Sequence, residues 1–299
     1  MSAGAAVLVV GDVITDIIVR PDGPLRRGSD QRATIRTRPG GSAANQAAWL
    51  AACGARVKFA ARVGAADLAA HAAHLRALGV EPCLAADPEA PSGVLVSIID
   101  ANGERSFLTD RGANLNLGPA DLPPALLDGV GLVSVSGYSL FAPGPRAAVL
   151  GLLATARERR LPTALDAASV GFLAEVGADA FLGWAAGTDV LFANADEAAA
   201  LTGSGDLDAQ MRKLGAIATH IIVKRGADGA ASGGRDGLRL SLPAPGVEVL
   251  DTTGAGDAFA AAFLAARLRG EPEAACLTAA IATGTAATTY LGGQPPRHA

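Results

Sequence analysis

The 299-residue sequence has little basic charge and no long apolar run. It contains only three lysines, and 29 Asp and Glu residues outnumber 25 Lys and Arg residues, which gives a net charge of −4. A nucleic-acid-binding surface needs concentrated basic charge to neutralise phosphates, so we expect no nucleic-acid partner. No stretch approaches the roughly 20 apolar residues that cross a bilayer, so we expect no membrane partner. The sequence therefore favours small-molecule chemistry.

Cysteines are also few. The three residues Cys53, Cys83 and Cys276 are far apart, and none forms a CxxC pair. This pattern is typical of buried thiols in a reducing compartment. The first ten residues have no basic region before their short apolar run, which soon meets Asp12, and so they indicate a strand rather than a signal peptide. We therefore expect a soluble, cytoplasmic protein.

Several common active-site motifs are missing. No lysine follows a glycine, so the phosphate-binding motif GxxxxGK[ST] cannot occur. The first predicted strand continues into Gly11-Asp12-Val13-Ile14 rather than GxGxxG, which disfavours a nicotinamide-dependent dehydrogenase. There is no HExxH and no GxSxG. Zinc proteases and serine hydrolases of the common types are therefore not expected.

Short β-rich runs alternate with longer segments rich in Ala and Leu. The runs are 7–10, 57–61, 130–135, 163–165, 190–192 and 220–223. This alternation is typical of βαβ units and predicts an α/β fold around a parallel sheet. Among the helical segments, Ser42 is expected to cap a helix that ends at Gly54, and Asp67 to open one that ends at Gly79. A further helix is predicted over 256–269.

Residues 13–37 and 93–110 depart from this alternation and are predicted to form strands of a second, smaller sheet. Asn102-Gly103 in the latter is a strong hairpin signal. A sheet inserted at these points would stand over the strand ends, where ligands bind in open α/β sheets. We therefore expect a discontinuous organisation. Its core, with the nucleotide site and catalytic base, comprises 1–12, 38–92 and 111–299, and its lid over the substrate site comprises 13–37 and 93–110.

The stretch Asp251-Thr252-Thr253-Gly254-Ala255-Gly256-Asp257-Ala258-Phe259 is the most informative in the chain. The turn Gly254-Ala255-Gly256 leads directly into a predicted helix, whose free N–H groups and dipole favour an anion. Asp257 lies in the first turn, where its carboxylate can reach an alcohol that attacks a phosphorus atom held there. The same residues would also suit a glycine-rich C-cap followed by an Asp N-cap.

This stretch resembles the C-terminal signature of the PfkB, or ribokinase-like, family of carbohydrate kinases. Residues 40–47, GGSAANQA, followed by Gly54 and Gly64, resemble the N-terminal signature of that family. The resemblance covers nearly the whole chain. It implies a ribokinase-like three-layer α/β/α sandwich with a mainly parallel central sheet and a small β-sheet lid, and it implies the use of ATP and Mg²⁺.

The resemblance assigns roles around the phosphates. Asp257 would be the catalytic base, and Gly254, Ala255 and Gly256 would stabilise charge on the transferred γ-phosphoryl group. Asn194 and Glu197 match the family's NxxE element, which helps to hold Mg²⁺ and the phosphates, mostly through water. An amide and a carboxylate suit the outer shell of an ion that keeps several waters. These two residues would also suit a capping pattern that opens a helix over 195–202.

The remaining nucleotide residues match the family's strand and turn beside ATP. Gly226 and Gly229 belong to that turn, and Gly226 would let the backbone approach the nucleotide. Lys224 would reach a phosphate, although family members often carry another residue there. Asp251 and Thr253 match the start of the monovalent-cation site of some members, which makes K⁺ activation a hypothesis.

On the substrate side, Asp16, Gly41 and Asn45 match positions that contact a sugar. A carboxylate and an amide are well suited to hold paired hydroxyls. Asp16 could instead be a strand-end residue that pairs with an arginine of the lid. The leading interpretation is an ATP-dependent kinase that phosphorylates a primary hydroxyl of a sugar.

Departures from the family patterns leave the acceptor open. Ile14 stands where ribokinases usually have Asn, and Ser42 and Ala43 interrupt the usual GGKGAN. The DxNxR of 2-keto-3-deoxygluconate kinases is missing after Asp166, which disfavours an acidic sugar unless Arg111 or another lid arginine substitutes.

Nucleoside kinases of the adenosine, cytidine or pseudouridine type are a further alternative, with Ile14, Tyr138 and Phe107 as an apolar surface for the base. A non-catalytic sugar- or nucleotide-binding relative is a different class, which the intact Asp257 disfavours. Exposed edges of the lid strands would favour a homodimer.

Overall fold

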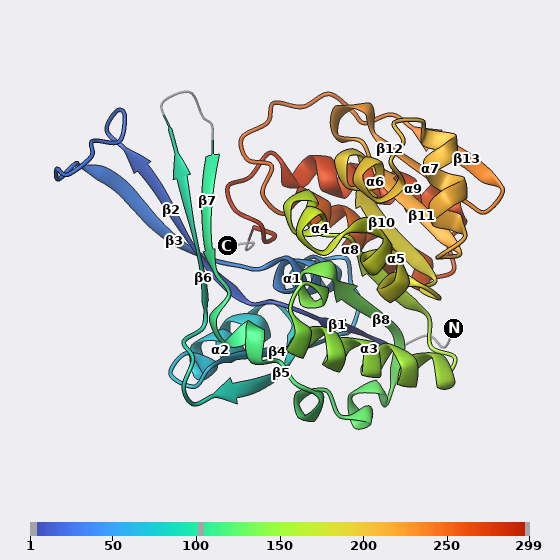
Figure 1. Cartoon of the computed structure of the whole chain (residues 1–299), viewed down its shortest axis with the longest axis horizontal. Helices are drawn as coiled ribbons and strands as arrows, with labels where there is room; N and C mark the ends of the chain where they lie inside the picture. Colours follow the sequence, from blue (N-terminus) through green and yellow to red (C-terminus); the bar gives the residue numbers. More distant parts are fainter. Residues whose placement is uncertain (1–4, 101–104, 297–299) are drawn as a thin grey trace.

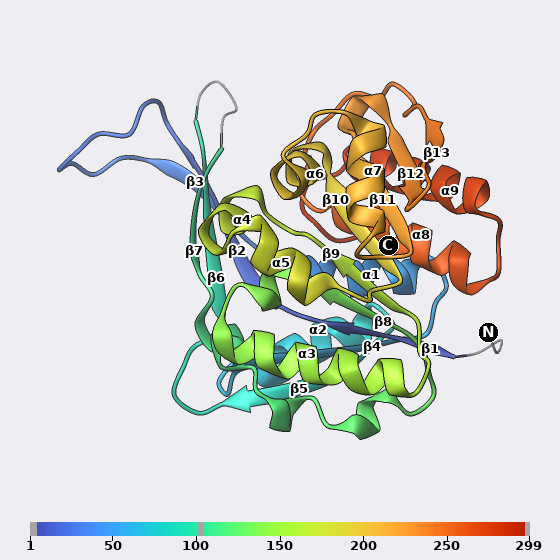
Figure 2. The same cartoon turned by 45° about the vertical axis from the view of Figure 1, so that its right-hand side comes forward.

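Two β-sheets organise the molecule (Figures 1 and 2). A computed structural model describes residues 5–100 and 105–296. The predicted turn at Asn102-Gly103 lies outside the described residues. The large sheet has nine strands in the order β13-β12-β11-β10-β9-β8-β1-β4-β5. All neighbours from β11 to β5 pair in parallel, whereas β12 and β13 pair antiparallel. The predicted mainly parallel sheet is therefore confirmed.

The strands of the large sheet have the following bounds: β1 (Ala6–Val10), β4 (Val57–Gly64), β5 (Val80–Asp87), β8 (Val130–Ser136), β9 (Thr163–Asp166), β10 (Val190–Asn194), β11 (His220–Lys224), β12 (Ala230–Gly234) and β13 (Gly237–Leu242). The six predicted strands are all present. Strand β5 has no sequence-based prediction, and it contains Pro82, which an edge strand tolerates. Strand β12 has none either, because its small residues lack β-propensity. One reason for a small residue is visible at Gly233, where a Cβ would collide with the side chain of Met211.

Helices cover both faces of this sheet. Those packed on one face are α1 (Ser42–Ala52), α2 (Leu68–Ala77), α8 (Ala255–Leu268) and α9 (Glu273–Ala287). Those on the other are α3 (Pro143–Glu158), α4 (Val170–Val176), α5 (Ala178–Ala185), α6 (Ala195–Thr202) and α7 (Leu207–Gly215). Short 3₁₀ segments connect them at Gly112–Asn116, Pro119–Asp121, Pro124–Leu127, Gly137–Leu140 and Gly226–Asp228.

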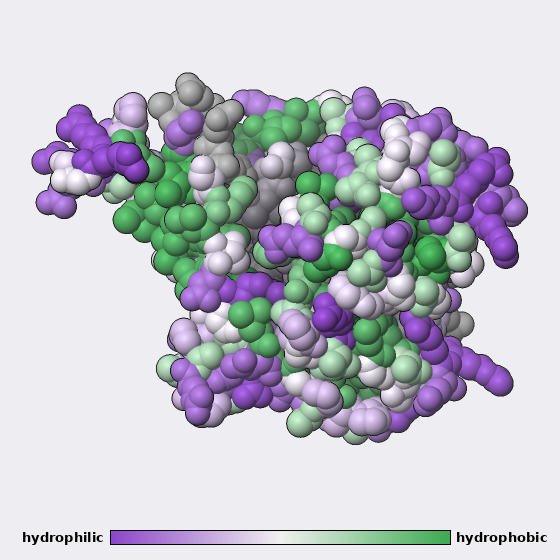
Figure 3. All heavy atoms as spheres, viewed as in Figure 1, coloured by the Kyte–Doolittle hydropathy of each residue, from purple (hydrophilic) through white to green (hydrophobic). Residues whose placement is uncertain are grey.

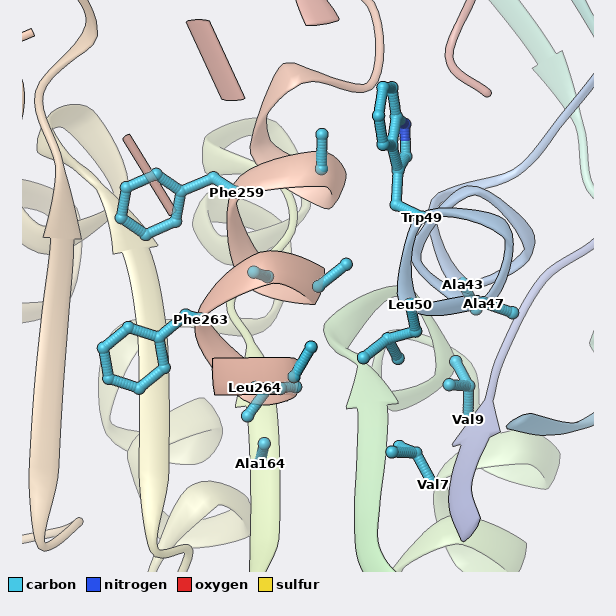
Figure 4. Packing of buried hydrophobic residues seen from close by; sticks show 14 of the residues in the cluster. Val7, Val9, Ala43, Ala47, Trp49, Leu50, Ala164, Phe259, Phe263 and Leu264 are labelled. Carbon is cyan, nitrogen blue, oxygen red and sulfur yellow. The ribbon is translucent and has the colours of Figure 1, made fainter. Parts of the chain in front are cut away.

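The alternation of side chains along β1 divides the core in two. Val7 and Val9 belong to the cluster under α1 and α8, and Leu8 belongs to the cluster under α3. Figure 4 shows Val7 and Val9 near Leu50 of α1, and Leu264 of α8 on the other side of Leu50. Because a parallel strand is buried on both faces, a continuous apolar run is required there. The predicted three-layer α/β/α arrangement is confirmed.

The small sheet comprises β2 (Ile14–Pro21), β3 (Ala33–Gly40), β6 (Gly93–Ile99) and β7 (Arg105–Asp110), in the order β3-β2-β6-β7. Strand β2 pairs antiparallel with β3 and parallel with β6, and β6 pairs antiparallel with β7. It projects from the side of the large sheet (Figure 1). Strand β3 runs directly into α1, so the small sheet ends where the helix of the N-terminal motif begins.

All three cysteines are free thiols. Cys276 is buried as expected, but Cys53 and Cys83 are only half-buried, which corrects the expectation for those two. No described helix is long and apolar enough to span a membrane.

Candidate active site

A cavity of about 600 Å³ opens where the carboxyl ends of β9, β10 and β11 meet the N-terminus of α8. It brings together the nine residues that the sequence analysis assigned to catalysis, ATP or Mg²⁺: Asn194, Glu197, Lys224, Gly226, Gly229, Gly254, Ala255, Gly256 and Asp257. This is the edge of an open α/β sheet at which ligands bind. The nine residues come from three separate parts of the chain, so the fold assembles one site from them.

The N-terminus of α8 lies at the cavity wall with little side-chain cover. Gly254 is the N-cap residue and has a left-handed φ of 73°. A Cβ there would collide with the backbone of Gly293. Residues 243–253 before this turn are irregular, so no helix ends there. Asp257 is the third residue of α8, so it is not an N-cap. The alternative of a glycine-rich C-cap followed by an Asp N-cap is therefore wrong. Ala255 N donates to Thr252 O over 3.2 Å, and the first turn of α8 lines the cavity with its backbone, as an anion site requires.

Asp257 is held by two side chains of α1. Its Oδ1 accepts a hydrogen bond of 2.7 Å from Ser42 Oγ, and its Oδ2 accepts one of 3.1 Å from Asn45 Nδ2. The pKa of Asp257 is raised to about 7, because burial and the charge of Asp166 raise it by more than Ser42, Asn45 and Lys224 lower it. A carboxyl group that titrates near neutrality is suited to take a proton from an alcohol and later release it.

Ser42 has a different role from the predicted one. The N-cap of α1 is Gly41, and no side chain caps this helix. Ser42 is the first helical residue, and its hydroxyl is bonded to Asp257 instead. The sequence contains no local signal for this contact, because the two residues lie 215 positions apart.

Lys224 extends from β11 toward the N-terminus of α8. Its Nζ lies 2.7 Å from Asp166 Oδ2, and a Cβ built on Gly256 would lie 3.3 Å from that Nζ. Burial alone would lower the pKa of Lys224, but the charges of Asp166 and Glu197 raise it. The side chain is therefore an ammonium ion at the cavity wall. The sequence alone predicts no role for Asp166. It is the last residue of β9, and ligands of open α/β sheets bind at the carboxyl ends of the strands.

Asn194 and Glu197 form a capping box at the start of α6, as the alternative from the sequence proposed. Glu197 N donates to Asn194 Oδ1, and Asn194 N and Nδ2 donate to the two oxygens of the Glu197 carboxylate, each over 2.8 Å. Burial raises the pKa of Glu197, and the charge of Lys224 opposes this. The described residues contain no group of three or more His, Cys, Asp or Glu side chains arranged to hold a metal ion.

The two glycines of the turn after β11 differ in what they do. Gly226 has a φ of +56°, lines the cavity and has open space where a Cβ would be. Gly229 has a φ of +84°, and a Cβ there would collide with the carbonyl oxygen of Leu242. Gly226 thus leaves room for a ligand, and Gly229 is required by the packing of the turn on β13.

The predicted sugar residues lie beside the cavity rather than among its lining. Asp16, on β2, lies against Gly40, where no Cβ would fit, and burial together with the charge of Asp251 raises its pKa to about 6. Gly41 has a φ of 93° and approaches the backbone of Asp12 and Ile14. Within residues 5–100 and 105–296, Asp16 makes no ion pair with an arginine.

Asp251 shapes the turn before α8. Its Oδ1 accepts a hydrogen bond from Thr253 N, and its Oδ2 accepts one from Gly292 N, each of 2.9 Å. The C-terminal segment is held nearby by Trp49 Nε1, which donates to Gly293 O over 2.9 Å. The predicted cation residues therefore lie where the C-terminal segment meets the turn of the anion site.

The residues considered for recognising a base or an acid group are dispersed. Tyr138 lines the cavity, but Ile14 is buried against Gly93 and Phe107 is exposed on β7. Arg111 forms a buried two-point ion pair with Asp12, at 2.8 and 2.9 Å, so it is not available for a substrate carboxylate.

Comparisons with known proteins agree on one family. The model described as pfkB family carbohydrate kinase matches residues 5–299. Ribokinase of Arabidopsis thaliana is 28% identical over 308 residues, covering 96% of this chain and 77% of that protein. Aminoimidazole riboside kinase of Salmonella typhimurium is 29% identical over 293 residues, covering 88% of this chain and 81% of that protein.

Solved structures with this fold include two enzymes that are 25% identical to the chain. Adenosine kinase from Sinorhizobium meliloti has a TM-score of 0.86, covering 98% of this chain and 96% of that one. Arabidopsis thaliana ribokinase complexed with ribose and ATP has a TM-score of 0.79, covering 97% of this chain and 94% of that one.

Proposed function

Since the chain belongs to the pfkB family of carbohydrate kinases, we propose that it transfers the γ-phosphoryl group of ATP to a primary hydroxyl of a sugar. Membership makes it a phosphotransferase with an alcohol acceptor, in a class that acts on sugars and nucleosides. The observation that carries the proposal is the position of Asp257, a carboxyl group with a pKa of about 7 in the first turn of a helix whose N-terminus lines the cavity.

These residues divide the work of an in-line transfer. Asp257 accepts the proton of the attacking hydroxyl while the new O–P bond forms and the bond from the γ-phosphorus to the bridging oxygen of ADP breaks. The backbone N–H groups of Gly254 and Gly256 stabilise the charge on the phosphoryl oxygens. That of Ala255 donates to Thr252 O over 3.2 Å in this structure, so it joins them only when that bond is exchanged for the phosphoryl group. Lys224, 3.3 Å from the Cβ position of Gly256, adds a cation on the same side.

The family implies ATP and Mg²⁺, and the cavity suits both. Gly226 and Gly229 border the nucleotide at the turn after β11, where Gly226 leaves open space. Asn194 and Glu197 fit an outer shell of Mg²⁺, because both carboxylate oxygens already accept hydrogen bonds and a water can still join them to the ion. When bound, Mg²⁺ neutralises charge on the phosphates.

We propose that the acceptor lies between Asp257 and the small sheet, which would act as a lid. Asn45 supports this position, because its Nδ2 donates to Asp257 while its Oδ1 is buried without a partner among the described residues. Asp16 and Gly41 complete a polar lining suited to paired hydroxyls. Arg111 is engaged by Asp12, which weighs against 2-keto-3-deoxygluconate.

A nucleoside is the second candidate acceptor. The relatives include an aminoimidazole riboside kinase and an adenosine kinase, whose substrates carry a base on the ribose. Tyr138, half-buried at the cavity wall beside Asp257, is an aromatic surface that could receive such a base. A non-catalytic binding relative is disfavoured, because a binding protein has no use for a carboxyl group poised as a base.

We also propose a monovalent-cation site at Asp251 and Thr253. Support comes from the burial of Asp251 and from the hydrogen bonds that its carboxylate accepts from Thr253 N and Gly292 N, which hold the turn against the C-terminal segment. Activity that rises in K⁺ relative to Na⁺ at equal ionic strength is expected, and equal rates in the two salts would remove the hypothesis.

A homodimer through the small sheet is proposed from its apolar face. The registers pair Ile35 with Val19 and Leu108 with Val96, so these side chains share the face opposite Asp16. Ile35 and Leu108 are 61% and 63% exposed, and Figure 3 shows apolar surface gathered on the middle of this sheet. Light scattering should give twice the monomer mass, and I35D/L108D should give the monomer. A monomeric wild type would contradict this.

The test of the kinase proposal is ADP release with Mg²⁺ and K⁺ across ribose, fructose, 2-keto-3-deoxygluconate, adenosine, cytidine and pseudouridine. One acceptor should stand out, and D257N should lose most of the turnover while it still binds ATP. A silent panel with intact ATP binding would mean that the panel lacks the true acceptor or that the chain is a non-catalytic relative. Activity retained by D257N would remove Asp257 as the base.

A further inference from the structure

Lys224 occupies a position that is electrostatically unfavourable on its own. Its side chain is 15% exposed, and its Nζ lies 3.3 Å from the Cβ position of Gly256 in the first turn of α8. The N-terminus of a helix carries partial positive charge, which repels a cation. Burial of an ammonium ion adds a further cost. Such a position is stable only with an acid group beside it and favours a ligand that carries negative charge.

Asp166 is that acid group, and its own position is fixed. Its Oδ2 lies 2.7 Å from Lys224 Nζ, and its Oδ1 accepts a hydrogen bond of 3.2 Å from Ala168 N. Ala168 has a φ of 74°, a left-handed conformation that is rare for alanine. The backbone oxygen of Asp166 fills the space beside Gly137. The turn after β9 thus holds the carboxylate in one place.

Glu197 does not replace Asp166 as the partner of the ammonium. Both of its carboxylate oxygens accept hydrogen bonds from Asn194 in the capping box. Its charge contributes to the pKa of Lys224, but the only ion pair of Lys224 among the described residues is with Asp166. The charge of Asp257 also acts on Lys224, but Asp166 is the one carboxylate that the ammonium contacts directly among the described residues.

We propose that Asp166 is a positioning residue that holds the Lys224 ammonium beside the N-terminus of α8, where it contacts the γ-phosphate of ATP. The inference rests on the proposed function, because it assumes that the anion bound there is the transferred phosphoryl group. The helix N-terminus and the ammonium then converge on one anion from two sides. ADP lacks the γ-phosphate, so it would not use this arrangement.

The variant D166N separates positioning from folding. Asn keeps an Oδ1 that can accept from Ala168 N, but its Nδ2 cannot accept from Lys224. With Mg²⁺ present, titration calorimetry should show ATP binding weakened about tenfold in D166N and in K224M. ADP binding should stay within about twofold of wild type. The matched control is D189N, which removes a carboxylate bonded to Thr163 N at the other end of β9 and should alter neither affinity.

A double-mutant cycle shows whether Asp166 acts through Lys224. In a K224M background, D166N should change ATP affinity by less than about twofold, because the cation that it positions is gone. Additive losses, equal losses for ATP and ADP, or unchanged ATP binding in D166N would each overturn the inference. Failure of the wild-type protein to bind ATP would instead refute the proposed function, so the two failures are distinguishable.

Discussion

The hydrogen bond from Ser42 to Asp257 should set the pH at which the enzyme becomes active. Ser42 Oγ donates to Asp257 Oδ1 over 2.7 Å, and this bond partly offsets the burial that raises the pKa of Asp257 to about 7. A hydrogen bond to a charged group contributes about 1.5–3 kcal/mol, and one pKa unit corresponds to about 1.4 kcal/mol. The variant S42A should therefore raise the pKa of Asp257 by about one to two units.

The expected consequence depends on pH in a defined way. The base works as the carboxylate, so a higher pKa removes activity at neutral and acidic pH and leaves it at alkaline pH. At pH 7 the ionised fraction falls from about one half to between a tenth and a hundredth, which predicts a loss of about five-fold to fifty-fold. Above the raised pKa the two rates should converge.

The assay is the pH dependence of kcat/KM for the best acceptor of the panel, measured as ADP release. The matched control is S134A, because Ser134 Oγ also bonds to α1, through Gln46 Oε1 at 3.2 Å, but does not contact Asp257. S134A should leave the acidic limb of the profile in place. A uniform fall of kcat/KM at every pH in S42A would refute the reasoning, because it would mean that the bond orients the site without tuning the base.

Three other residues give separate predictions. G254A should lower kcat at least about a hundredfold, because a Cβ would displace Gly293 and disturb the anion site, whereas G151A in α3 has open space and should not. F263A should lower the free energy of unfolding in urea by about 3–5 kcal/mol, since Phe263 is a fully buried ring, and an undiminished midpoint would contradict this packing. Hydrogen bonds led by that from Ala90 N lower the pKa of Asp87. Stability from Asp87 is therefore present above the ordinary Asp pKa of about 3.9 and lost as pH falls, and D87N should flatten acid unfolding curves in that range.

The sequence predicted those parts of the fold that depend on local patterns. The β-branched run at the start of the chain predicted β1, and the capping pattern at Asn194 predicted α6, which begins and ends where expected. Strand β5 was missed because Pro82 argues against a strand unless the edge position is known. The glycine turn and Asp257 were predicted because small residues at a helix N-terminus indicate an anion site, and this signal needs no residue from elsewhere in the chain. Ser42 was assigned to a cap, because its true partner is brought near only by the fold.

Two sets of groups around Asp257 have opposite effects on its pKa, and this gives a final prediction. Ser42, Asn45 and Lys224 lower its pKa, whereas burial and the charge of Asp166 raise it. D166N removes the charge of Asp166, whose effect on this pKa is larger than that of Lys224, so the acidic limb of kcat/KM should move to lower pH even when Lys224 is released, the reverse of S42A. A general disturbance of the site would reduce activity in both variants without shifting the limbs in opposite directions. Profiles that move the same way would contradict this account of the pKa of Asp257, whatever the loss of activity in either variant.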